Sequence, residues 1–144
     1  MTMTTAHAHT LDIINLNIAL PRGQRLLRNV SLQLEPGEVR ALVGESGAGK
    51  SMIGKAVLGI LPHKIKRTEG EILLEGAHLN AMSPTTRRNT VAKMSALIPQ
   101  DPLTALNPVR KIGPQITDPL TRIHGWSHQH ALARARELLD RVHI

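Results

Sequence analysis

The sequence contains no cysteine, no phenylalanine and no tyrosine, and its single tryptophan is Trp126. The absence of cysteine excludes a disulfide framework and a zinc site with cysteine ligands. Because aromatic rings are almost absent, the core must be built from leucine, isoleucine, valine, alanine and methionine. The same shortage removes the rings on which single-stranded nucleic acid usually stacks, so we do not expect nucleic acid as a partner.

Long hydrophobic runs are also missing. No stretch of 18 apolar residues occurs, and the opening MTMTTAHAHT lacks the charged start and apolar segment of a secretory signal. We therefore expect a soluble, cytoplasmic protein with one domain, because 144 residues suffice for a moderate core. The net charge of +7 raises nucleic acid or a membrane surface as partners. The 18 basic residues are spread along the chain, however, which favours a solvated basic surface.

Short apolar stretches separated by turn signals predict an α/β fold. Residues 11–20 and 30–39 alternate apolar and polar side chains, as half-buried strands do. Continuous apolar runs predict further strands at 38–44, 71–76 and 95–100.

Helices are predicted between and after these strands. Residues 51–61 fit a helix that is closed by Pro62, and 83–89 fit a short helix or turn. Residues 62–70 are expected to form a basic loop. Prolines at 108, 114 and 119 predict that any helix in that region is broken or short.

A firmer helix is predicted near the end of the sequence, with Ser127 as its N-cap. Its apolar residues recur at helical spacing and its charged residues occupy the opposite face. The apolar set is Ala131, Ala135, Leu138, Leu139 and Val142, and the charged set is Arg134, Arg136, Glu137, Asp140 and Arg141.

The stretch GESGAGKS fits the phosphate-binding pattern G-x-x-x-x-G-K-S/T. Its glycines have no Cβ, so the backbone can adopt positive φ and bring N–H groups to phosphate oxygens. We expect Lys50 to place a positive charge at the β- and γ-phosphates and to take part in catalysis, while Ser51 offers its hydroxyl to Mg²⁺. Strand, loop and helix follow in the order that points a helix N-terminus at the phosphates. The predicted ligand is a nucleoside triphosphate with magnesium, rather than an empty glycine-rich turn. The predicted contact residues are Gly44, Glu45, Ser46, Gly47, Ala48, Gly49, Lys50, Ser51 and Met52.

Four stretches, ALVGESGAGKS, LGILP, GEILLEG and QDPLTALNP, resemble the ATP-binding subunits of ABC transporters, from about Leu11 to the last residue. QDPLTALNP resembles the Q-loop of oligopeptide and dipeptide importers, a branch that also includes nickel importers. The resemblance implies an α/β P-loop NTPase fold of the ABC nucleotide-binding type. It further implies a frayed leader at 1–10, the N-terminal part of an ATP-binding core at 11–100, and the start of a helical subdomain at 101–144.

Within this resemblance, Gln100 corresponds to a glutamine that contacts Mg²⁺ and the attacking water, so Gln100 joins Lys50 as a catalytic candidate and Ser51 as a metal candidate. Asp101 to Pro114 corresponds to the region that meets the coupling helix of the membrane subunits. Independently, a glutamine at the carboxyl end of a strand beside the phosphate loop lies where open α/β sheets bind ligands. From spacing alone, a solvent-facing polar residue is an equal alternative.

The resemblance also implies cofactors, partners and a location. The cofactors are ATP and Mg²⁺. The partners are transmembrane permease subunits, a second ATP-binding subunit in a homo- or heterodimer and, indirectly, a substrate-binding protein. The expected location is the inner face of the cell membrane, as a peripheral cytoplasmic subunit. Peptides are the expected cargo, with nickel as the alternative.

The sequence departs from the family's pattern in several places. No aromatic residue occurs in 20–28 to stack on adenine, which leaves Pro21, Arg22 and Arg25 as candidates to cover the base. Met52 stands where a second hydroxyl is common. A Walker B aspartate with its following glutamate, a switch histidine and an LSGGQ-like signature are absent. We expect the N-terminal part of a longer ATPase, which alone binds nucleotide weakly and hydrolyses it negligibly.

Other classes fit less well. A P-loop GTPase would carry an N-K-x-D motif, which is absent, and a P-loop kinase would carry a lid of arginines. A chromosome-associated ABC ATPase would explain the charge but not QDPLTALNP. The remaining alternative is a truncated nucleotide-binding or interaction module that does not hydrolyse nucleotide. Metal binding by the pairs His7 and His9 or His128 and His130 is disfavoured, because no third ligand accompanies either pair.

Overall fold

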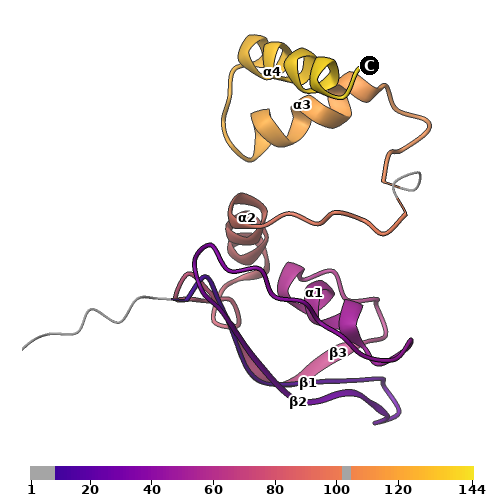
Figure 1. Ribbon diagram of the computed structural model, residues 1–144. Helices are drawn as coiled ribbons and strands as arrows, with labels where there is room; N and C mark the ends of the chain where they lie inside the picture. The colour runs from indigo at the N-terminus through magenta and orange to yellow at the C-terminus, as the bar shows by residue number, and fades with distance from the viewer. Residues whose placement is uncertain (1–8, 102–104) are drawn as a thin grey trace, which may run out of the picture. The chain divides into compact units, whose positions relative to one another are not determined.

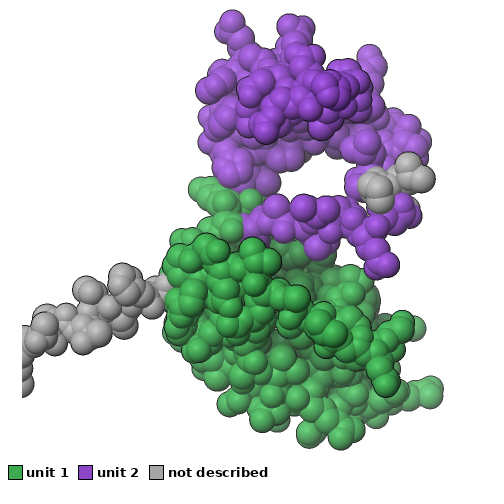
Figure 2. Space-filling view, viewed as in Figure 1, with its two compact units in different colours: residues 1–94 green, residues 95–144 purple. Residues whose placement is uncertain are grey.

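The structure is a computed structural model that describes residues 9–101 and 105–144 (Figure 1). The chain divides into two compact units, residues 1–94 and 95–144 (Figure 2). Within the described ranges, no helix combines the length and apolar character needed to cross a bilayer. The elements of these ranges are β1 (Leu11–Ala19), β2 (Arg25–Leu34), α1 (Lys50–Leu58), β3 (Lys66–Leu74), β4 (Ala77–His78), α2 (Pro84–Met94), α3 (Ile112–Arg122) and α4 (His128–Arg141). The assignment of 101–144 to a helical subdomain stays a prediction.

The sheet of the first unit has four strands in the order β2-β1-β3-β4, and every neighbouring pair is antiparallel. Leu11 of β1 lies opposite Leu34 on one side and Leu74 on the other. The strands predicted at 11–20 and 71–76 are confirmed, apart from their last one or two residues, as β1 and as part of β3. The strand predicted at 30–39 is confirmed only over 30–34, because β2 ends at Leu34 and a turn follows. The basic loop predicted at 62–70 is wrong in its second half, because β3 begins at Lys66, where the backbone pairs with Ala19.

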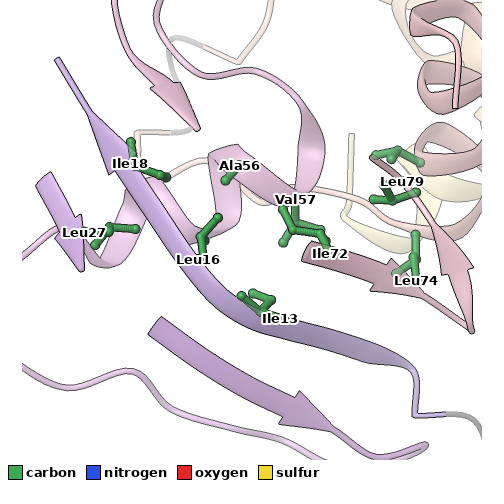
Figure 3. Packing of buried hydrophobic residues seen from close by; sticks show 10 residues of the cluster. Ile13, Leu16, Ile18, Leu27, Ala56, Val57, Ile72, Leu74 and Leu79 are labelled. Carbon is green, nitrogen blue, oxygen red and sulfur yellow. The ribbon is translucent and has the colours of Figure 1, made fainter. Parts of the chain in front are cut away.

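Aliphatic side chains from the sheet and from α1 form one core (Figure 3). Leu16 and Ile72 have no exposed surface, and Ala56 and Val57 of α1 pack in the same cluster. This core contains no aromatic ring, as the composition predicts. The full set of buried core residues in the first unit's cluster is Ile13, Leu16, Ile18, Leu27, Ala56, Val57, Ile72, Leu74, Leu79 and Val91.

A bulge in β1 brings two backbones into close contact. Asn15 adopts a positive φ of 51°, and the register of β1 with both neighbours shifts beside it. Gly70 on β3 faces this bulge with φ of 92°, and a Cβ built on it would lie 2.5 Å from the Asn15 oxygen. Only glycine has room there. Asn17 is buried at 7% exposure, and its side chain donates to Asn15 O at 2.9 Å and accepts from Asn29 N at 3.1 Å.

The strands predicted at 38–44 and 95–100 do not form, and both predictions are wrong for this structure. Val39 and Val43 are 97% and 93% exposed, and Ile98 is 91% exposed. A buried strand needs hydrogen-bonded neighbours and packed layers on both faces, since its backbone polar groups must be paired. Neither segment belongs to the four-stranded sheet of the described residues. Apolar residues alone are therefore not enough to make either segment a strand.

The helices of the first unit differ from prediction at their ends. Helix α1 ends at Leu58 rather than at residue 61, because Gly59 adopts φ of 72° and closes the helix. Gly59 N donates to Ala56 O and Ile60 N donates to Lys55 O, a pairing that satisfies the last carbonyls. Helix α2 is longer than the predicted 83–89 and begins after Ser83, whose hydroxyl accepts from Thr86 N at 3.2 Å.

Helix α3 contradicts the expectation that prolines break or shorten any helix between 101 and 122. It runs for 11 residues with Pro119 in its interior. Pro114 lies in the first turn, where an N–H would have no intrahelical partner, so its ring is tolerated there. Thr117 is buried beside the interior proline, and Thr121 Oγ1 donates to its carbonyl at 3.2 Å.

Helix α4 packs against α3 in the second unit. The predicted N-cap is confirmed, because Ser127 Oγ accepts from His130 N at 3.2 Å. Ala131 and Ala135 are buried as predicted, and Leu138 and Leu139 are half-buried. The apolar face ends there: Val142 is 61% exposed.

We predict that Gly70→Ala destabilises the first unit more than Gly23→Ala does. Both glycines have positive φ, but a Cβ on Gly23 would meet nothing within 4 Å, whereas one on Gly70 would strike the Asn15 backbone. Both variants carry a strain of roughly 1–2 kcal/mol, and Gly70→Ala adds about 1–3 kcal/mol of steric overlap. Urea unfolding of the two variants measures the difference. Equal midpoints would show that the bulge is not a close contact.

Candidate functional site

The predicted phosphate loop forms a continuous exposed turn from Gly44 into the first turn of α1. Gly47 and Gly49 adopt φ of 84° and 85°, the left-handed conformation that glycine permits, while Gly44 does not. Ala48 N donates to Glu45 O at 3.2 Å, which closes the turn. Two of the three glycines therefore have the conformation that aims successive backbone N–H groups into a concave, anion-binding shape.

Gly49 fixes the loop against strand β2. It is the N-cap residue of α1. A Cβ on this residue would lie 2.6 Å from Leu27 Cδ2 and 3.3 Å from Leu26 O. Leu27 is itself buried in the core, so it has little freedom to withdraw. The start of α1 is thus held directly on the sheet because residue 49 has no side chain.

Lys50 bonds to the loop that precedes it. Its Nζ donates to Gly44 O at 2.8 Å and to Glu45 O at 2.6 Å. An ammonium group has three N–H donors, so these two bonds place the positive charge at the loop and leave capacity for an anionic oxygen. The side chain needs only to exchange carbonyl partners for phosphate oxygens when a ligand binds.

The N-terminus of α1 carries no acidic residue in its first turn and no side-chain cap. Its free N–H groups and the positive end of the helix dipole therefore favour an anion. Ser51 is exposed, which leaves its hydroxyl accessible. Met52 donates its N–H to Gly49 O at 2.8 Å and packs its side chain against the core, so its contribution is structural in this state.

The segment that leads into the loop is not braced in the same way. Residues 38–44 form no strand, and Val43, directly before Gly44, is almost fully exposed. Near the start of this segment, the Glu38 carboxylate accepts from Glu35 N at 2.9 Å and from Arg40 Nε at 2.7 Å, and at its end Gly44 O accepts from Lys50. The cradle is therefore anchored at its helix end.

Gln100 is exposed and belongs to the second unit, whereas the phosphate loop belongs to the first. Part of the QDPLTALNP stretch, residues 102–104, lies outside the described residues. Its metal and catalytic roles stay predictions.

Sequence reasoning missed the residue that organises the segment after this stretch. The Gln115 side chain accepts from Asn107 N at 2.7 Å and donates to Asn107 O and Arg110 O, both at 3.0 Å. Arg110 in turn donates to Asp118 Oδ2 at 2.7 Å, and this hydrogen bond lowers the pKa of the Asp118 carboxyl. The polar residues around Pro114 were visible in the sequence. Their pairing could not be predicted, because it depends on helix α3, and the prolines predicted that a helix there would be broken or short.

Two of the residues proposed to cover a nucleotide base line pockets beside the β1–β2 turn. Pro21 lines a pocket of about 620 Å³ together with Lys64, and an adjoining pocket of about 580 Å³ is lined by Pro21 and Arg22. Arg25 is exposed at the start of β2 and lines neither. No aromatic ring contributes, as the sequence requires.

The histidines form local contacts instead of clusters. His9 pairs with Asp12 at 2.6 Å and with Glu35 at 3.0 Å, and the hydrogen bond to Asp12 raises the pKa of His9. His130 stacks on Trp126 with a centroid distance of 4.4 Å. Among residues 9–101 and 105–144, no group of three histidine or acidic side chains is placed to hold a metal. Mg²⁺ would fit this site in another way, through a hydroxyl such as that of Ser51 and the ligand's own phosphates.

Comparisons with known proteins agree with the family that the loop sequence resembles. Residues 27–144 match the protein-family profile described as ABC transporter. The chain is 42% identical over 121 residues to the oligopeptide transport ATP-binding protein OppD of Bacillus subtilis, covering 82% of this chain and 33% of that protein. It is 35% identical over 143 residues to the dipeptide transport ATP-binding protein DppD of Lactococcus lactis, covering 96% and 41%.

Two further matches are an import protein and a solved exporter structure. The glutathione import ATP-binding protein GsiA of Salmonella typhimurium is 38% identical over 143 residues, covering 93% of this chain and 23% of that protein. Among solved structures, a bacterial Atm1-family ABC exporter with ATP bound matches with a TM-score of 0.48 and 26% identity, covering 59% of this chain and 14% of the exporter. The chain thus spans well under half the length of these curated relatives.

We predict that Gly49→Ala weakens the packing of α1 on β2, whereas Gly47→Ala does not. The two residues have nearly the same φ, but a Cβ on Gly47 would meet nothing within 4 Å. Gly49→Ala should cost about 1–3 kcal/mol more in urea unfolding, the usual range for overpacking. A double-mutant cycle with Leu27→Ala isolates the contact: Leu27→Ala should cost less in the Gly49→Ala background. An unchanged cost would disprove the contact.

Proposed function

The chain belongs to the ABC transporter family, and from this premise we propose that it is part of the ATP-binding subunit of a peptide importer, with Gly44 to Ser51 holding the phosphates of Mg-ATP. The predicted fold class, an ABC-type nucleotide-binding domain with a sheet and helices, is confirmed.

One observation carries the binding proposal: the uncapped N-terminus of α1 follows a loop with two left-handed glycines, and Lys50 already lies against that loop. Backbone N–H groups, a helix dipole and one mobile cation then converge on the same exposed position. Several backbone N–H donors and one ammonium group at the same position suit a polyphosphate, which has many acceptor oxygens, better than a carboxylate, which has two. ATP is preferred over GTP on family grounds, since the chain has no guanine-reading motif.

The peptide class is supported by the relatives and by the sequence. OppD is an oligopeptide transport ATP-binding protein, DppD a dipeptide transport ATP-binding protein and SapD of Haemophilus influenzae a peptide transport ATP-binding protein. QDPLTALNP resembles the same branch. Nickel import is the alternative cargo, because the cargo is selected by other subunits.

In the proposed mechanism, the side chains of this chain bind and orient the nucleotide. Lys50 moves its ammonium group from the carbonyls of Gly44 and Glu45 to the β- and γ-phosphates. Ser51 and Gln100 would hold a magnesium ion, which would neutralise phosphate charge. Gln100 also orients the attacking water. The segment from Asp101 to Pro114, in which Gln115 ties down Asn107 and Arg110, would transmit the state of the site to the permease subunits.

Partners and location follow from the same proposal. The subunit works at the inner face of the cell membrane with transmembrane permease subunits and a second ATP-binding subunit, while a substrate-binding protein delivers the peptide. ATP hydrolysis and transport are activities of that whole assembly.

A second candidate is nucleotide binding without turnover by this chain alone. The exposure of Val39 and Val43 favours it, because the strand side of the cradle is not packed and the bound geometry needed for hydrolysis is not held rigidly.

We predict that Lys50→Ala lowers the affinity for Mg-ATP by about 10- to 100-fold, the loss expected for a charge-assisted hydrogen bond to phosphate. The matched control is Lys55→Ala, which removes the same charge from the last turn of α1. Calorimetric titration with Mg-ATP and with Mg-GTP measures both. An affinity that Lys50→Ala leaves unchanged would refute the cradle, whereas equal ATP and GTP affinities would refute only the base preference.

We predict that Gln100→Ala and Ser51→Ala each reduce the gain in ATP affinity that Mg²⁺ provides. The measurement is ATP titration with Mg²⁺ and with a chelator in its place. Gln129→Ala is the control, since Gln129 is an exposed glutamine on α4 of the same unit. If Ser51→Ala reduces the gain and Gln100→Ala does not, the loop binds the metal and the role of Gln100 is wrong.

A further inference from the structure

A pocket of about 430 Å³ at the C-terminal end of α1 collects three arginines and no carboxylate. Arg67 comes from β3, and Arg87 and Arg88 come from α2. Among the described residues, none of the three takes part in an ion pair. Like charges gathered without a counter-charge repel one another, so the pocket favours an anion.

Arg87 is held in place and still has an unused donor. Its Nη2 donates to Ala56 O at 2.8 Å, and its guanidinium lies beside Gly59, where a built Cβ would be 3.7 Å from Cζ. Its Nε is buried and has no hydrogen-bond partner. Burial lowers the pKa of Arg87, and the charge of Arg67 lowers it further. A buried donor without an acceptor is costly, and an anionic oxygen would relieve that cost.

Asn80 supplies a complementary group in the same pocket. Its Nδ2 donates to Gly70 O at 3.0 Å, and Arg67 Nη1 donates to the same carbonyl. Asn80 Oδ1 is buried and, like Arg87 Nε, lacks a partner. The pocket therefore presents cationic donors together with one acceptor that needs an O–H or N–H group.

We propose that this pocket binds a phosphate-type oxyanion, either inorganic phosphate or a phosphomonoester. Its oxygens accept from Arg87 Nε and from the guanidinium groups of Arg67 and Arg88, and the P–OH group that inorganic phosphate keeps at neutral pH donates to Asn80 Oδ1. Arginine forks match phosphate oxygens in geometry as well as charge. A carboxylate or sulfate offers the acceptors but no O–H at neutral pH, and a bridging water offers no charge to offset three arginines.

This site is separate from the phosphate loop. The pocket adjoins Leu58, Gly59 and Ile60 at one end of α1, while Lys50 begins the helix at the other end. A helix of 9 residues spans about 13 Å along its axis. The inference goes beyond the proposed nucleotide function and does not depend on it.

The test titrates the ¹⁵N-labelled chain with inorganic phosphate and, in a second arm, with glycerol phosphate, at constant ionic strength set by chloride. All samples carry Lys50→Ala, so that the phosphate loop is weakened. We expect saturable amide shifts at Gly59 and Asn80, with sulfate at least several-fold weaker. Arg88→Gln should weaken phosphate binding by about tenfold, the loss of a charge-assisted contact. Arg88 is exposed and has no side-chain bond within the fold among the described residues, so the variant should fold.

Arg28→Gln is the matched control, because Arg28 is an exposed arginine on β2 that does not line the pocket. It should leave the affinity unchanged. If Arg28→Gln and Arg88→Gln weaken phosphate binding equally, the affinity depends only on the net charge of the protein, and the pocket proposal is wrong. Shifts confined to residues 44–51, non-saturating shifts or no shifts would each overturn the proposal without touching the ATP-binding proposal. Tight binding in only one arm would identify which phosphate source the pocket takes.

Discussion

The contact of Gly49 with β2 is the constraint on which the candidate site depends. A side chain at this position would overlap Leu27 and the carbonyl of Leu26, so glycine lets the start of α1 lie on the sheet. Once the start is fixed, Ala56 and Val57 reach the core and the helix N-terminus faces the loop. The same small residue thus links the packing of the first unit to the placement of the anion-binding N–H groups.

Parts of both units could be predicted because their signals are local. The alternation in 11–20 and 30–34, the positive φ of Gly47 and Gly49, and the cap at Ser127 each involve residues close in sequence. A turn, a cap or a half-buried strand in a hairpin needs few distant partners.

The errors lie where structure depends on distant partners. Residues 38–44 have the composition of a buried strand, yet no strand of the described sheet pairs with them. Helix α3 persists despite Pro119, because packing with α4 outweighs one lost hydrogen bond. The arginine pocket could not be predicted from the sequence. Arg67 lay in a predicted basic loop and Arg87 in a predicted short helix or turn, and only the fold brings both to the lining of one pocket with Asn80.

The uneven anchoring of the loop has a consequence for affinity. The helix side of the cradle is held by Gly49 and by the two bonds of Lys50, whereas residues 38–44 form no strand and leave Val39 and Val43 exposed. Apparent affinity falls in proportion to the fraction of molecules that already hold the competent conformation. Anything that pairs the backbone of 38–44 and covers Val39 and Val43 would raise that fraction without touching the nucleotide. If the loop binds ATP as proposed, the affinity would therefore depend on the packing of this segment as well as on the glycines and the lysine of the loop.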